Sequence, residues 1–77
     1  MQLDILSPDK KLYSGTVKYI SLPGKDGSLG ILEDHAPLIT VLKKGTIKIE
    51  GPEGTENFEV NGGVVEVLKN KVIILAE

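Results

Sequence analysis

Residues 58–75 read FEVNGGVVEVLKNKVIIL, and this stretch decides the fold class. Val65 and Val67 point to one face of an extended segment, while the residues beside them point to the other. A period of two over several positions is typical of a half-buried β-strand. The flanking segments 61–63 (NGG) and 69–71 (KNK) carry residues that favour tight hairpin turns, so we expect a hairpin at each.

The same alternation continues over the rest of the chain. Further pairs of alternating apolar residues are Leu3 and Ile5, Ile47 and Ile49, and Phe58 and Val60. Turn residues separate these runs in the segments 7–9 (SPD), 23–27 (PGKDG) and 51–54 (GPEG), where proline fixes φ and glycine permits positive φ. The pattern predicts one all-β domain over residues 1–77, a small β-sandwich of short, mostly antiparallel strands.

Only the segment 31–42 (ILEDHAPLITVL) is compatible with a short helix, because Leu38, Val41 and Leu42 share helical spacing. Pro37 opposes a helix that begins before it. The β-branched residues 39–41 favour a strand. We therefore predict a turn around Glu33–Ala36 and a strand over 38–42.

Some strands also carry apolar residues on their second face, namely Val64, Leu68, Ile73 and Leu75. Strands that are apolar on both faces lie between layers or are covered by something outside the chain. Two interpretations stay open, a tightly folded small sandwich and a partner-facing patch. Glu66, between Val64 and Leu68, is expected to be an outward-facing charge.

Composition excludes several kinds of function. Without cysteine, the chain has no disulfide, thiolate metal site or cysteine nucleophile. All nine basic residues are lysine and the net charge is −2, which argues against a nucleic-acid binder with a basic stripe. We expect no signal peptide or membrane span, because apolar runs such as 72–75 fall far short of the roughly 20 residues that a span needs.

The candidate residues for chemistry are few. His35 lies in a loop-like segment, and no serine occupies a nucleophile-elbow context, so we expect His35 to bond the backbone or a partner. The glycine-rich segment 24–30 (GKDGSLG) lacks the Gly-Lys-Ser/Thr ending of a phosphate loop. We expect no catalytic residue, cofactor or metal. The residues alone predict a small binding or structural module.

Several segments share their order and spacing with a known family. They are LDILSP (3–8), LYSG (12–15), PGKDGSLGIL (23–32), HAPLIT (35–40), KG (44–45), FEVNGGVVEV (58–67) and NKVIILA (70–76). Together they resemble the epsilon subunit of the rotary F-type ATP synthase, whose mitochondrial counterpart is called delta. The resemblance covers essentially the whole chain.

The resemblance implies a β-sandwich of about ten short strands at the foot of the central stalk. It implies a non-catalytic rotor subunit that binds the gamma subunit, rests on the polar loops of the membrane c-ring and couples ion transport to ATP synthesis. The implied location is the cytoplasmic face of the bacterial plasma membrane, with membrane association only through the complex.

The resemblance also assigns individual residues to the contacts with the c-ring and with gamma. The residues matching the region that touches the c-ring are Gly27, Ser28, Leu29 and Gly30. Many relatives carry an acidic residue where Ser28 stands, so this chain lacks that charge. The residues matching the region that faces gamma are Ser7, His35, Ala36, Pro37, Leu38 and Asn61.

Longer relatives continue into two C-terminal helices that can inhibit ATP hydrolysis, whereas this sequence stops at Glu77. A naturally short subunit and a truncated one both fit, and in either case we expect no helical domain and no helix-mediated inhibition. The alternative function is a small β-barrel that binds oligosaccharide or single-stranded nucleic acid. It requires aromatic platforms and a basic groove, and the chain offers only Tyr13, Tyr19 and Phe58 and no arginine.

Overall fold

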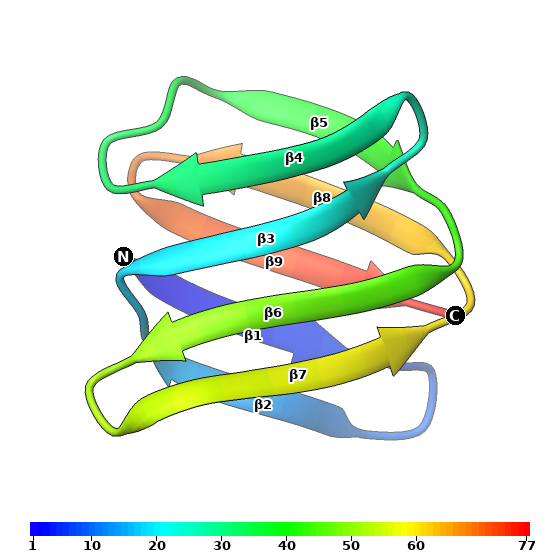
Figure 1. Cartoon of the computed structure of the whole chain (residues 1–77), viewed down its shortest axis with the longest axis horizontal. Helices are drawn as coiled ribbons and strands as arrows, with labels where there is room; N and C mark the ends of the chain where they lie inside the picture. The colour runs from blue at the N-terminus through cyan, green and yellow to red at the C-terminus, as the bar shows by residue number, and fades with distance from the viewer.

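The computed structural model describes all 77 residues and contains nine strands and no helix. A single sheet is curled into two layers (Figure 1). One layer has the order β4 (Gly27–Leu32), β3 (Tyr19–Gly24), β6 (Gly45–Gly51), β7 (Gly54–Val60). The other has the order β5 (Leu38–Leu42), β8 (Gly63–Leu68), β9 (Lys71–Ala76), β1 (Gln2–Leu6), β2 (Lys11–Thr16).

The layers join where the backbone of Gly24 in β3 pairs with Leu42 in β5. Every pairing is antiparallel except that of β1 with β9, which is parallel. The predicted all-β sandwich is therefore confirmed, with nine strands. The segment 31–42 contains a turn at Glu33 and Asp34 followed by strand β5, as the proline and the β-branched residues indicated.

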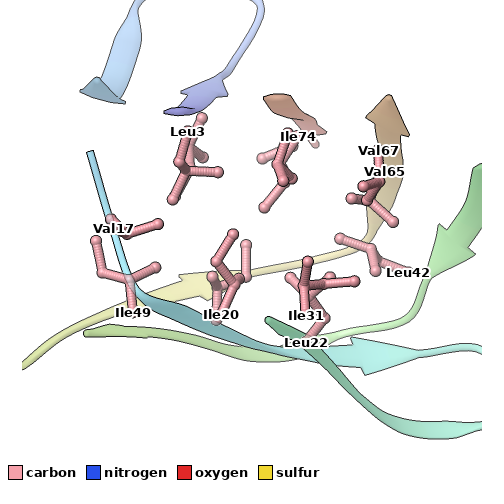
Figure 2. Close-up of a cluster of buried hydrophobic side chains, with 14 of the residues drawn as sticks. Leu3, Val17, Ile20, Leu22, Ile31, Leu42, Ile49, Val65, Val67 and Ile74 are labelled. Atoms are coloured by element: carbon pink, nitrogen blue, oxygen red, sulfur yellow. The ribbon is translucent and has the colours of Figure 1, made fainter. Parts of the chain in front are cut away.

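The core lies between the two layers and contains 16 buried apolar residues and no buried polar side chain. Figure 2 shows Leu3, Val65 and Ile74 of one layer facing Ile20 and Leu22 of the other. The apolar residues of the alternating pattern point inward, because burying one side of each strand removes apolar surface from water.

The turn predicted at residues 69–71 is confirmed, and the one at 61–63 is wrong. Lys69 and Asn70 have positive φ values of 51° and 62° and join β8 to β9 in a two-residue hairpin, as in a type I′ turn. Segment 61–63 forms no hairpin, because β7 pairs only with β6 while β8 pairs with β5 and β9. It crosses from one layer to the other.

The loops gather at two ends of the sandwich. At the Met1 end, the amino group of Met1 lies 3.1 Å from the Glu33 carboxylate, and the Asp34 N–H donates to the Asn70 side chain. At the Glu77 end, the Glu77 N–H donates to the Gly62 carbonyl oxygen. A six-residue strand spans about 20 Å, which sets the separation of the two ends.

Candidate functional site

The outward side of strands β5, β8 and β9 carries a surface of apolar residues around one charged residue, Glu66, and we call this surface the apolar face. Its residues are Ile39, Val41, Val64, Leu68, Ile73 and Leu75. Ile39 is 71% exposed and Leu75 is 53% exposed. Exposed apolar side chains are common singly, but a contiguous group of them marks an interaction site.

The strand register makes this face contiguous. Val41 pairs with Val64, and Val64 pairs with Leu75, so the three form one row across the strands. The next row contains Ile39, Glu66 and Ile73. Side chains directly opposite on neighbouring strands lie within contact range of each other.

The opposite layer has a different outer surface. Its middle row contains Ser21, Lys48 and Asn57, which pair across β3, β6 and β7. Leu32 in β4, which is 62% exposed, is the one large exposed apolar residue outside the apolar face. The two outer surfaces of the sandwich are therefore chemically distinct, and only the apolar face is suited to burial against a partner.

The residues assigned to the c-ring contact lie in and beside the β3–β4 hairpin at the Glu77 end. Gly27 pairs with Gly24, and the exposed Ser28 pairs with Pro23. The ring of Tyr19 lies across Gly30, where an added Cβ would come 2.8 Å from the Tyr19 hydroxyl oxygen. The tip of this hairpin exposes Lys25, Asp26, Gly27 and Ser28.

The residues assigned to the gamma contact do not form one cluster. Ser7 follows β1 and Asn61 follows β7, so both lie at the Glu77 end. Residues 35–37 precede β5 at the Met1 end, where the Nδ1–H of His35 donates to the carbonyl oxygen of Ala36 at 2.6 Å. That bond agrees with the expectation that His35 is a loop histidine bonded to the backbone.

The apolar face extends between these two groups of residues. Leu38 begins β5 and pairs with Val67, next to the exposed Leu68. At the other end Leu6 pairs with Leu75, and Ser7 follows Leu6 directly. A partner that lies along the strands would touch both groups and cover the apolar face between them.

Val64, Leu68, Ile73 and Leu75 stand out in the sequence as apolar residues on a second strand face, but no face could be assigned to Ile39 and Val41. The alternation within β5 separates these two residues from Leu38, Thr40 and Leu42. Only the pairing of β5 with β8 shows that they extend the same surface.

No group of three or more His, Asp or Glu residues is placed to hold a metal ion. No helix in the structure could cross a membrane. Tyr13 and Phe58 pack edge to face against the core, with ring centroids 5.9 Å apart.

Comparison with known proteins gives a consistent result. Residues 1–77 match the family model described as the β-sandwich domain of the ATP synthase delta/epsilon chain. The chain is 40% identical over 77 residues to the ATP synthase epsilon chain of Jannaschia sp. (strain CCS1), and spans 58% of that relative's length.

Two solved structures share the fold. A chain of the Euglena gracilis mitochondrial ATP synthase, solved with its OSCP, F1 and c-ring parts, matches with a TM-score of 0.89 and 22% identity over 96% of this chain and 48% of that one. A chain of the central stalk and c-ring of the Tetrahymena thermophila mitochondrial ATP synthase matches with a TM-score of 0.80 and 24% identity, over 97% and 61% of the two chains.

Proposed function

This chain belongs to the β-sandwich family of the ATP synthase delta/epsilon chain, and on that premise we propose that it is a non-catalytic rotor subunit of the central stalk. In this role it links the gamma subunit to the membrane c-ring and supports the coupling of ion transport to ATP synthesis. It associates with the cytoplasmic face of the bacterial plasma membrane only through the complex. The sandwich of residues 1–77 makes both contacts.

The observation that carries this proposal is the apolar face. A stalk subunit must stay bound while torque passes through it, and long-lived interfaces bury apolar area with good packing. The apolar face supplies such area on one side only, and we assign it to gamma. Of the residues assigned to gamma, Ser7 follows Leu6, which pairs with Leu75 at the Glu77 end of this face, and His35, Ala36, Pro37 and Leu38 lead into β5 at its Met1 end. Asn61 begins the segment that crosses from the other layer to β8.

The c-ring contact falls on the β3–β4 hairpin. Gly27, Ser28, Leu29 and Gly30 lie in the layer that does not carry the apolar face. Gly27 has a φ of 134° and nothing within 4 Å of the position a Cβ would take, so the backbone there is open to close approach by polar loops. One sandwich thus offers an apolar contact to gamma and a polar contact to the ring.

Removal of this chain from its ATP synthase tests the proposal. We expect the complex without it to fall apart or to hydrolyse ATP without pumping ions, because gamma and the ring lose their connection. ATP-driven uptake of the coupling ion, H+ or Na+, by inverted membrane vesicles, measured beside ATP hydrolysis, reports this coupling. Adding back the purified chain should restore pumping. A complete, fully coupled synthase without the chain would contradict the proposal.

A further inference from the structure

Glu66 is the only charged residue in the interior of the apolar face. It lies in the middle strand, β8, and pairs with Ile39 on one side and Ile73 on the other. Val64 and Leu68 precede and follow it on the same side of β8, and both are exposed. It lines a hollow of this face together with Ile39, Val64, Ile73 and Leu75.

The chain itself provides no partner for this carboxylate. Asp4, two strands away in the same row, accepts a hydrogen bond from the Ser14 hydroxyl at 2.6 Å. Glu66 takes part in no side-chain hydrogen bond, and the one ion pair in the structure joins Met1 to Glu33. Lys71 lines a neighbouring hollow with Glu66 but does not come within ion-pair distance of it.

In the free chain the Glu66 side chain is exposed, so water supplies the hydrogen bonds of its carboxylate. When a partner covers the surrounding apolar side chains, that water is removed. An ionised carboxylate that loses its water without gaining a partner is strongly destabilising. An interface that buries this face must therefore neutralise Glu66.

We propose that the subunit covering the apolar face presents a lysine or arginine side chain to Glu66, within an otherwise apolar surface. This inference rests on the proposed function, which places gamma on this face. The ion pair fixes the register of the two surfaces, because apolar contacts alone allow sliding while a single buried charge pair does not.

The position of Glu66 favours pairing over a role in keeping the free chain soluble. Charges that suppress aggregation flank apolar strands, and here Lys71 and Asp4 already occupy the flank of the apolar face. Glu66 instead lies at the centre of the apolar face, where a partner that covers the face separates its carboxylate from bulk water.

The test is a titration of the purified gamma subunit against the purified chain at several salt concentrations. Glu66→Gln keeps the shape of the side chain and removes its charge. We expect it to bind gamma at least 10-fold more weakly than the original chain at low salt, with a smaller decrease in affinity as salt is raised. Glu50→Gln, an exposed charge on the opposite outer surface, should bind as the original does.

A charge exchange identifies the partner residue. Glu66→Lys should lose binding, and one member of a panel of single Lys→Glu and Arg→Glu variants of gamma should restore it. If Glu66→Gln binds gamma as well as or better than the original chain while Leu75→Asp abolishes binding, the ion pair is refuted and the proposed function stands. If the original chain does not bind gamma, the proposed function fails and this inference fails with it.

Discussion

Replacing Gly63 with alanine is expected to remove about 3 kcal/mol or more of folding stability, through backbone strain combined with overpacking. Gly63 has a φ of 152°, and a Cβ there would lie 2.3 Å from the carbonyl oxygen of Leu75. That oxygen belongs to the backbone of the neighbouring strand, so the clash can be relieved only by moving β8 away from β9. A domain of this size has a total stability of about 4–12 kcal/mol, so guanidinium denaturation should show a large fall in midpoint.

Gly54→Ala is the matched control for this prediction. Gly54 also has a positive φ, of 121°, but nothing lies within 4 Å of the position its Cβ would take. Only the backbone strain of about 1–3 kcal/mol applies there, and we expect the lower part of that range in an exposed turn. Equal losses for the two variants would show that the contact with Leu75 does not matter.

Leu75→Asp is expected to weaken gamma binding by about 100-fold or more, which corresponds to about 2.7 kcal/mol. Leu75 belongs to the apolar face and pairs with Val64 on one side and Leu6 on the other. A carboxylate placed there would be buried without a partner when gamma binds. The side chain is 53% exposed in the chain alone, so the fold should survive. Isothermal titration calorimetry measures the affinity, and thermal unfolding checks the fold.

The control applies the same substitution to the other layer. Leu32 in β4 is 62% exposed and lies outside the apolar face. Leu32→Asp should therefore bind gamma as tightly as the original chain. Retained binding by Leu75→Asp, or an equal loss in both variants, would show that gamma does not recognise this face.

Much of the fold could be predicted because one periodicity dominates the chain. Strand β8 alternates strictly between buried and exposed residues, and the turn at Lys69 and Asn70 follows local rules of backbone geometry. The error at residues 61–63 has a physical reason. A glycine pair signals that positive φ is needed, but it does not distinguish a hairpin from a crossing between layers, which depends on how distant strands pair.

The candidate site was only partly predictable for the same reason. The exposed apolar side of β8 and β9 is visible in the alternation of Val64, Leu68 and Leu75. Its extension to Ile39 and the central position of Glu66 depend on the pairing of β5 with β8, which joins segments more than 20 residues apart. Ser7 and His35, which the resemblance assigns to gamma, are separate loop positions in the sequence, and the strands place them at opposite ends of the sandwich.

Methyl cross-saturation by nuclear magnetic resonance shows whether gamma covers the apolar face. The isoleucine, leucine and valine methyl groups of this chain are observed while gamma is irradiated in the complex. We expect strong attenuation at Ile39, Val64, Ile73 and Leu75 and none at Leu32, which is exposed on the other layer. Attenuation at Leu32 with unchanged signals from the apolar face would contradict the account.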